Sequence, residues 1–363
     1  MIYLVDLEYV ETRYTAEWKT FVPEYLRTNG LDVCIISGPD NIAACTTPGA
    51  FLNFSGTNVY KAEQVKIIAE LFSENKIKEG DKFLFTDAWH PGVINVKYMS
   101  ELLGVKVELH GLWHAGSYDP ADFLGRLIGD APWVRHAEKS FYECYDKNWF
   151  ASEFHIEMFV NTIVDNDDPY DTLPHPELIS SLRDKVQRTG WPFEYLDKKL
   201  ENNIEKENII LFPHRMAPEK QPDIFKSLAE HLPEYEFIFC QDLNLSKAEY
   251  HNLLKRAKMV FSANTQETLG ISCYEILCAG GMPLVPNRLS YVEMYEDVFK
   301  YPDHWTDGYK SYVHHLDVMK DKIKTLMDNF DTPEIQDAIN RNKQTLGKEY
   351  FSAYKLLQHL GGK

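Results

Sequence analysis

The stretch that decides the fold is residues 262–285, which read Ser262-Ala-Asn-Thr-Gln-Glu-Thr-Leu-Gly-Ile-Ser-Cys-Tyr-Glu-Ile-Leu-Cys-Ala-Gly-Gly-Met-Pro-Leu-Val285. An apolar run ends at Ser262, a polar loop leads to Glu267, and Gly270 precedes an apolar segment of helix length. This order predicts a helix from about Ile271 to Ala279, followed by a strand over Pro283–Val285. A strand, a helix and a second strand in succession form the repeating unit of a parallel sheet.

The same alternation of strand-length apolar runs and amphipathic segments extends over almost the whole chain. The first half contains predicted strands at Ile2–Asp6, Asp32–Ile36, Lys82–Thr86, Lys106–His110, Asn148–Ala151 and Lys185–Gln187. The second half adds strands at Asn208–Phe212, Glu236–Cys240 and Met259–Ser262, with helices over Pro222–Leu232 and Lys247–Arg256. The pattern therefore predicts an α/β protein with two doubly wound, Rossmann-like parallel sheets.

A change in composition near residue 190 separates the two series. The turn sequence Gly190-Trp-Pro-Phe193 is followed by the highly charged stretch 197–208, which is typical of a linker. We expect a first domain over 1–190, a linker over 191–207, a second domain over 208–345 and a C-terminal helix over 346–363 that returns to the first domain. In such sheets ligands bind outside the carboxyl ends of the strands, so we expect a central cleft that both sheets face.

Length, composition and charge limit the classes of function. A chain of 363 residues with 44% apolar residues is long enough for two globular domains. The net charge of −17 repels polyanions at long range and gives no support to nucleic-acid binding. The opening segment reads as a strand rather than a leader, and no segment is apolar enough to span a bilayer. The six scattered cysteines suit reduced thiols, so we expect a cytoplasmic protein.

Glu267 and Glu275 form a pair of carboxylates eight positions apart, a little over two helical turns. Each carboxylate is able to accept two hydrogen bonds from neighbouring hydroxyls, which suits the two sugar rings of a nucleotide sugar. The alternative is an exposed helix with two solvated carboxylates. The apolar continuation of the helix after Glu275 favours a buried position, where a carboxylate needs a partner.

Two cations, Arg215 and Lys220, lie on either side of a Pro-containing turn after the strand that ends at Phe212. Cations at the carboxyl end of a strand are suited to neutralising a diphosphate leaving group. Salt bridges at the surface are the alternative interpretation. The overall acidity of the chain favours the phosphate interpretation.

The run from about Ile209 to Tyr295 resembles the C-terminal donor domain of retaining GT-B glycosyltransferases of the family-4 type. That family carries an Arg and a Lys after a strand, and then two Glu separated by seven residues around a Gly-initiated helix. The residues at these positions here are Arg215, Lys220, Glu267, Gly270, Glu275 and Gly280. The chain departs from the pattern at Gln221, where relatives have Gly, and at Ile-Leu-Cys278 within the helix.

The resemblance implies a role for each of these residues. Arg215 and Lys220 would hold the diphosphate of the donor, Glu267 would bind the transferred sugar and Glu275 the ribose of the nucleotide. The backbone N–H groups of Thr268, Leu269, Gly270 and Ile271 would bind sugar or phosphate oxygens. The donor is expected to be a UDP-linked sugar, with no metal and no further cofactor; the acidic run at 165–171 is interpreted as a solvated loop.

The first domain conforms less well to the family. Its opening loop lacks the Gly-Gly of many relatives, and Arg13 and Thr15 are candidates to replace it at the phosphate. Trp89 and His90 follow the third predicted strand and are candidates for binding the acceptor.

Relatives often carry a histidine that touches the donor sugar at the end of the fourth strand. His114 is favoured for this catalytic role over His110, because His110 would end the strand itself. A structural histidine is the alternative.

The resemblance implies a retaining glycosyltransferase, and the acceptor is the least defined partner. A polysaccharide or a soluble glycoside is one candidate. A faint likeness to glycosyltransferases of bacteriophages adds a hydroxymethylated pyrimidine in DNA as another, although the acidity of the chain argues against duplex DNA. The alternatives to a transferase are an inactive sugar-nucleotide or glycan-binding protein and a GT-B epimerase.

Overall fold

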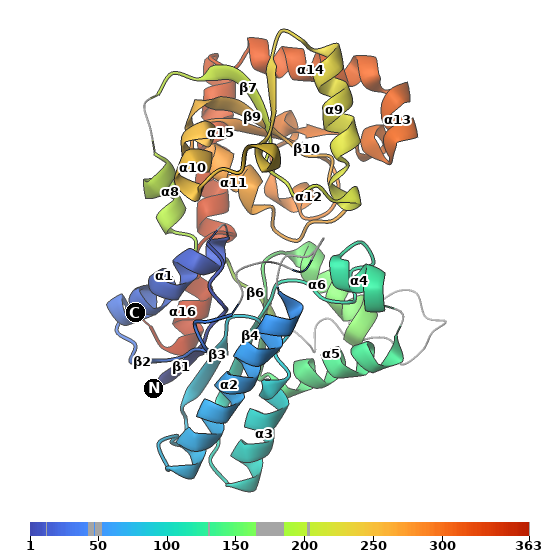
Figure 1. The fold of residues 1–363 in the computed structure, drawn as a ribbon. Coiled ribbons are helices and arrows are strands. Elements are labelled where there is room, and N and C mark those ends of the chain that lie inside the picture. The colour runs from blue at the N-terminus through green and yellow to red at the C-terminus, as the bar shows by residue number, and fades with distance from the viewer. Residues whose placement is uncertain are drawn as a thin grey trace. The chain divides into compact units, whose positions relative to one another are not determined.

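The computed structural model describes residues 1–11, 13–42, 47, 53–129, 131–164, 185–201 and 204–362. The chain forms two compact units: residues 1–192 together with 353–363 make the first, and residues 193–352 make the second (Figure 1). The acidic run at 165–171, expected to be a solvated loop, lies outside the described residues. The five described cysteines are free thiols.

The first unit contains a parallel sheet of six strands in the order β2-β1-β3-β4-β5-β6. Its strands are β1 (Ile2–Val5), β2 (Val33–Ile36), β3 (Lys82–Phe85), β4 (Glu108–Trp113), β5 (Lys147–Phe150) and β6 (Val186–Arg188). Its helices are α1 (Tyr14–Thr28), α2 (Phe54–Ser73), α3 (Gly92–Leu102), α4 (Phe123–Ile128), α5 (Pro132–Cys144), α6 (Glu153–Phe159), the π-helical turn Val160–Val164 and α16 (Tyr354–Leu360). All six strands predicted for this sheet are confirmed.

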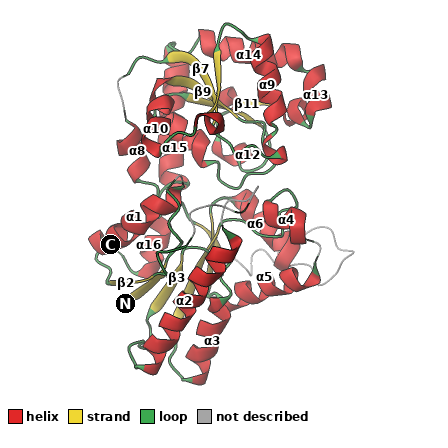
Figure 2. Cartoon of the chain, viewed as in Figure 1, coloured by secondary structure: helices red, strands yellow, loops and turns green. Residues whose placement is uncertain are grey.

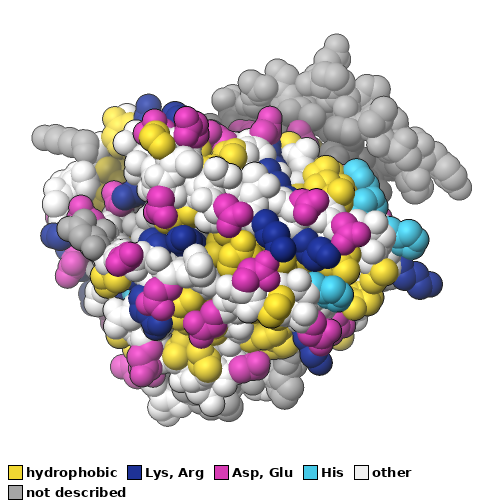
Figure 3. Space-filling view, turned by 90° about the horizontal axis from the view of Figure 1, so that it is seen from above, with side chains coloured by type: hydrophobic (Ala, Val, Ile, Leu, Met, Phe, Trp, Pro, Cys, Tyr) yellow, Lys and Arg dark blue, Asp and Glu magenta, His cyan; other side chains and the backbone are white. Residues whose placement is uncertain are grey.

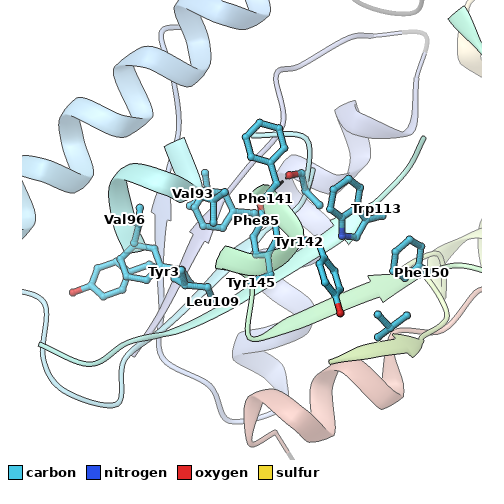
Figure 4. Packing of buried hydrophobic residues seen from close by; sticks show 14 of the residues in the cluster. Tyr3, Phe85, Val93, Val96, Leu109, Trp113, Phe141, Tyr142, Tyr145 and Phe150 are labelled. Atoms are coloured by element: carbon cyan, nitrogen blue, oxygen red, sulfur yellow. Dashed lines mark hydrogen bonds between the residues drawn. The ribbon is translucent and has the colours of Figure 1, made fainter. Parts of the chain in front are cut away.

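The core of the first unit is rich in aromatic side chains (Figure 4). Tyr3 and Phe83, from the paired strands β1 and β3, stack with ring centroids 4.9 Å apart. Trp113 of β4 packs on Phe159 at 4.6 Å. Tyr3, Phe83 and Trp113 are buried because the strands carry apolar side chains on both faces, which a parallel sheet covered by helices requires.

The C-terminal helix α16 belongs to the first unit. The backbone N–H of Leu356 donates to Thr189 Oγ1 at 3.2 Å, and Lys82 Nζ donates to the carbonyl of His359 at 2.7 Å. The ring of His359 lies 4.9 Å from that of Trp149. Helix α16 therefore contacts strands β3 and β5 of the first sheet.

The second unit contains a parallel sheet of five strands in the order β11-β10-β9-β7-β8. Its strands are β7 (Glu207–Phe212), β8 (Glu236–Phe239), β9 (Ala257–Phe261), β10 (Met282–Pro286) and β11 (Lys300–Tyr301). Its helices are α8 (Tyr195–Leu200), α9 (Pro222–His231), α10 (Lys247–Arg256), α11 (Ile271–Cys278), α12 (Tyr291–Met294), α13 (Tyr309–His314), α14 (Leu316–Asp328) and α15 (Pro333–Glu349). In Figure 2 the labelled strands β7, β9 and β11 lie among the helices of this unit.

The segment 191–207, predicted as a linker, contains helix α8, and the predicted C-terminal helix over 346–363 is divided between the end of α15 and α16. Two strands also differ from the sequence prediction. β4 runs to Trp113 rather than ending at His110, because the apolar residues Leu112 and Trp113 continue the strand into the core. β11 was not predicted, because two residues are too short to show a periodic pattern. The extension of β4 places His114 directly after the strand and His110 within it.

Candidate active site

The loop after β7 carries both predicted cations. Arg215 donates from Nε and Nη2 to Glu219 Oε1, at 3.0 and 2.6 Å. Lys220 ends the short 3₁₀ turn Pro218–Lys220, and its buried Nζ donates to the carbonyl of Gln266 at 2.5 Å. The loop therefore connects the end of β7 with the loop that follows β9.

Glu267 is the charge partner of Lys220. Its Oε2 lies 3.4 Å from Lys220 Nζ, and its Oε1 accepts hydrogen bonds from the N–H groups of Thr268 and Leu269, at 3.1 and 3.4 Å. Burial alone would raise the pKa of Glu267, but the charge of Lys220 and the backbone N–H groups outweigh burial and hold the pKa below its ordinary value. The site thus contains an ionised carboxylate next to a buried ammonium group.

Gly270 sets the geometry at the start of α11. Its backbone is left-handed, with φ 73° and ψ 53°, a conformation that costs energy for residues with a Cβ. A Cβ at this position would lie 2.9 Å from Cε1 of the buried Tyr291. Glycine is therefore required here for both conformation and space, and the predicted helix after it is confirmed.

Glu275 lies on α11 and has different neighbours from Glu267. Tyr250 of α10 donates its hydroxyl hydrogen to Glu275 Oε2 at 3.0 Å, and His251 Nε2 lies 4.0 Å from the other oxygen. Burial and then the charge of Glu275 raise the pKa of Tyr250 well above its ordinary value, so the phenol remains a donor. The ribose role of Glu275 stays a prediction.

Two residues near Glu267 were missed by the sequence analysis. His214 precedes Arg215, and electrostatic interactions couple it to Lys220 and Glu267. Asn264 donates from Nδ2 to Glu267 Oε2 at 3.4 Å and to the hydroxyl of Tyr291 at 3.0 Å. Their positions on the two loops that carry the predicted residues were the available signal, but a single polar residue in a loop has no periodicity that marks it as buried.

In the first unit His114 lies at the carboxyl end of β4 with both ring nitrogens engaged. Nε2 lies 2.6 Å from the carbonyl of Thr86, and Nδ1 lies 2.6 Å from the hydroxyl of Tyr14. Because a carbonyl only accepts, Nε2 carries the hydrogen and Nδ1 accepts from Tyr14. Burial lowers the pKa of His114 to about 4, so the ring is neutral, and its contact with donor sugar stays a prediction.

Trp89 and His90, the candidates for binding the acceptor, have structural partners. Trp89 donates from Nε1 to the buried Glu138 at 2.9 Å. His90 pairs with Gln64 Oε1 at 3.1 Å and accepts from the N–H of Gly92 at 3.1 Å. Neither ring offers its polar atoms to a ligand in this arrangement, so a role in binding acceptor would rest on ring faces.

Arg13 and Thr15 flank the first residue of α1. The Arg13 guanidinium carbon lies 5.6 Å from the centre of the Tyr14 ring. Thr15 is buried, and no hydrogen-bond partner for its hydroxyl occurs among the described residues. Phosphate binding by either residue stays a prediction.

Glu8, three residues after β1, is a further carboxylate that the sequence analysis did not single out. Its side chain is 5% exposed, and neither carboxylate oxygen has a hydrogen-bond partner in the part of the chain that the structure describes. It interacts electrostatically with Tyr14. A buried carboxylate without donors is costly, and this singles Glu8 out as a candidate binding group.

Among the described residues, no three His, Cys, Asp or Glu side chains gather as the ligands of a metal ion would. No described helix combines the length and apolar character needed to cross a membrane.

Solved structures of glycosyltransferases resemble this chain. WaaG, a glycosyltransferase involved in lipopolysaccharide biosynthesis, aligns with a TM-score of 0.58 and 12% identity over 100% of both chains. The catalytic domain of starch synthase IV from Arabidopsis thaliana, bound to ADP and acarbose, aligns with a TM-score of 0.61 and 10% identity over 99% of this chain and 98% of that domain.

A variant of S. aureus TarM in complex with fondaparinux, alpha-GlcNAc-glycerol and UDP aligns with a TM-score of 0.50 and 14% identity over 83% of this chain. The chain spans 58% of that TarM chain. No sequence-family profile and no curated protein sequence matches the chain. The structural likenesses and the two parallel sheets together show that this chain has the GT-B fold of glycosyltransferases, as the sequence predicted.

Proposed function

We propose that the chain is a glycosyltransferase that moves a sugar from a nucleotide-sugar donor onto an acceptor hydroxyl with retention of anomeric configuration. The observation that carries the proposal is the buried pair of Lys220 and Glu267, with 3.4 Å between Nζ and Oε2, in a chain of the GT-B fold. The ammonium group of Lys220 is suited to binding phosphate oxygens, and the carboxylate of Glu267 is suited to accepting hydrogen bonds from sugar hydroxyls.

The donor is proposed to be a UDP-linked sugar. Arg215 and Lys220 bind the diphosphate, Glu267 the transferred sugar, and Glu275 the ribose. The UDP present in the TarM structure and the ADP in that of starch synthase IV support a nucleoside diphosphate as the leaving group. The Arg215 guanidinium carries five N–H donors. Glu219 accepts from the one on Nε and from one on Nη2. The remaining donors are suited to binding phosphate.

The chemistry follows from the charges. As the bond between the anomeric carbon and the phosphate oxygen breaks, negative charge develops on the diphosphate, and Lys220 and Arg215 stabilise it. Glu267 holds the hydroxyls of the oxocarbenium-like sugar in place. The acceptor hydroxyl attacks from the face that the phosphate leaves, and the leaving phosphate takes its proton, which gives retention.

The acceptor is proposed to be an uncharged, hydroxyl-rich carbohydrate, either a polysaccharide or a soluble glycoside. The buried carboxylate of Glu8 suits hydroxyl donors and repels phosphate. The net charge of −17 opposes binding of a polyanion, and acidic and basic side chains are interspersed on the face shown in Figure 3. Hydroxymethylated DNA is the competing acceptor that the experiment has to exclude.

The test is to incubate the protein with a panel of nucleotide sugars and to measure release of nucleoside diphosphate with and without acceptors. Transfer to a glycan and NMR detection of an unchanged anomeric configuration support the proposal. Binding without release in the presence of any acceptor identifies a sugar-nucleotide-binding protein instead. An electrophoretic shift of hydroxymethylated DNA, absent with plain DNA, would replace the carbohydrate acceptor by DNA.

A further inference from the structure

His214 presents a hydrogen-bond acceptor that the described part of the protein does not use. The ring is buried and packs edge-on against Phe212, with centroids 5.1 Å apart. One ring nitrogen donates to the backbone carbonyl of Phe261, and Nε2 has no hydrogen-bond partner among the described residues. The bond to Phe261 is therefore made by Nδ1–H, which leaves a lone pair on Nε2.

The ring stays neutral at physiological pH. Burial, and then the charge of Lys220, lower the pKa of His214 to about 3. Nε2 is consequently an acceptor and not a donor. A buried acceptor without a donor is unfavourable, so a ligand that supplies the donor gains free energy on binding.

Asn264 presents a second acceptor of the same kind. Its Nδ2 donates to the carboxylate of Glu267, an acceptor only, and to the hydroxyl of Tyr291. These two bonds fix which end of the amide is nitrogen, because an amide oxygen placed against the carboxylate would be repelled. The side chain is fully buried, and its Oδ1 lacks a partner within the described ranges.

A third acceptor, the carboxylate of Glu267, interacts with both residues. Asn264 touches that carboxylate directly, and His214 is coupled to it electrostatically. Phosphate oxygens at neutral pH supply no hydrogen for such atoms, whereas sugar hydroxyls do. His214 Nε2 and Asn264 Oδ1, which have no donor among the described residues, therefore favour a hydroxyl-bearing ligand over an anion.

We propose that His214 Nε2 and Asn264 Oδ1 are specificity-determining groups that accept hydrogen bonds from hydroxyls of the transferred sugar. The proposal rests on the proposed function, because it assigns part of the donor site. It predicts that the nucleotide portion binds independently of His214. It also predicts that a donor sugar without the hydroxyl that donates to His214 binds more weakly than the parent sugar.

The experiment compares two ligands by calorimetry: the nucleoside diphosphate alone, and the nucleotide sugar that the wild-type protein binds best in the panel. His214→Phe keeps a planar ring but removes the Nε2 acceptor together with the Nδ1–H donor to Phe261, and His214→Gln restores an acceptor oxygen. His231→Phe, at the exposed end of α9, is the matched control. Thermal unfolding checks that each variant is folded.

We expect His214→Phe to weaken binding of the nucleotide sugar three- to tenfold, on the order of one hydrogen bond. Binding of the nucleoside diphosphate should change less than about twofold. His214→Gln should recover most of the loss, and His231→Phe should behave as wild type. Among monodeoxy analogues of the sugar, one should bind wild type more weakly but bind His214→Phe as well as the parent sugar does.

Equal weakening of both ligands, or no weakening of either, in a folded His214→Phe variant would overturn the proposal while leaving the transferase function standing. The proposal is also overturned, with the transferase function left standing, if every deoxy analogue that binds wild type more weakly than the parent sugar also binds His214→Phe more weakly than the parent sugar. A wild-type protein that binds neither nucleotide nor nucleotide sugar refutes the proposed function and this inference together.

Discussion

At the scale of single residues, the candidate donor site is dominated by charge that is buried and paired. Lys220 and Glu267 are both largely withdrawn from solvent, and taking ions out of water is expensive unless hydrogen bonds replace the lost hydration. Here the carbonyl of Gln266 and the N–H groups of Thr268 and Leu269 provide those bonds. Removing one partner leaves the other uncompensated, so the variants that test the site need a measurement of folding beside each measurement of function.

Glu267→Gln tests the sugar-binding carboxylate. The amide keeps the size of the side chain but loses the charge-assisted hydrogen bonds, which contribute roughly 1.5–3 kcal/mol each. We expect turnover to fall by about 10- to 100-fold, with a smaller effect on the thermal midpoint. Glu334→Gln, an exposed change in α15, is the control, and full transfer activity in folded Glu267→Gln would show that the carboxylate is not used.

Lys220→Ala tests the phosphate site. Loss of the ammonium group removes a charge-assisted contact to the diphosphate, and we expect the Kd for nucleoside diphosphate to rise about tenfold or more. Isothermal titration of wild type, Lys220→Ala and the exposed control Lys226→Ala measures the effect. An unchanged Kd would place the diphosphate elsewhere.

Glu8→Gln separates stability from acceptor use. Neutralising a buried carboxylate that lacks donors among the described residues should raise the free energy of unfolding by about 1 kcal/mol. The same change should raise the KM for acceptor, because a neutral amide accepts hydroxyl hydrogens less strongly. Glu11→Gln, exposed in the same loop, is the comparison, and a destabilised Glu8→Gln would indicate that the protein itself partners the carboxylate.

At the scale of elements, the start of α11 is the feature on which the site depends. Gly270 turns the backbone with positive φ between the loop that holds Glu267 and the helix that holds Glu275. The helix is almost wholly buried, so it has little freedom to shift and absorb a larger residue. The direction of both carboxylates therefore depends on one glycine.

Gly270→Ala tests this dependence. A left-handed alanine costs about 1–2 kcal/mol, and its Cβ would also press on Tyr291 at 2.9 Å. Gly280→Ala, with φ 76° and only Lys206 Cε at 3.9 Å, carries the conformational cost without the clash. Urea unfolding should show Gly270→Ala as the less stable of the two, and equal stabilities would mean that Tyr291 moves aside without penalty.

At the scale of the whole molecule, buried neutral histidines make stability depend on pH. Burial lowers the pKa of His114 to about 4 and those of His90, His155 and His214 to about 3. An unfolded histidine titrates near 6.5. As the pH falls below that value, the unfolded state binds protons that the folded state does not bind. The free energy of unfolding therefore decreases until the pH reaches the pKa of the folded state.

We therefore expect stability to be fully present above about pH 6.5 and to fall between pH 6.5 and 4, by up to about 1.4 kcal/mol per pH unit for each histidine. His90, His114 and His155 lie in the first unit and His214 in the second. Hydrogen exchange read on peptides of each unit should show a larger loss in the first. Working at about 0.5 M salt limits the contribution of surface charge, and equal stability at pH 7 and 4.5 would contradict the expectation.

The sequence by itself predicted most of the fold and part of the candidate site. Strand and helix periods are local properties, so the alternation of apolar runs predicted both parallel sheets and the helix after Gly270. The spacing of Glu267 and Glu275 and the loop of Arg215 and Lys220 were readable for the same reason. The same local logic missed β11, whose two residues are too few to form a pattern.

Only the tertiary structure decided which groups are paired and which are left without a partner. Lys220 and Glu267 meet across 47 positions of sequence, and Tyr14 meets His114 across 100. The acceptors on His214, Asn264 and Glu8 that lack partners among the described residues became visible only once their neighbours were placed. The physical reason is that hydrogen-bond satisfaction depends on contacts between distant segments, whereas the periodicity that predicts a strand or a helix is contained in a few consecutive residues.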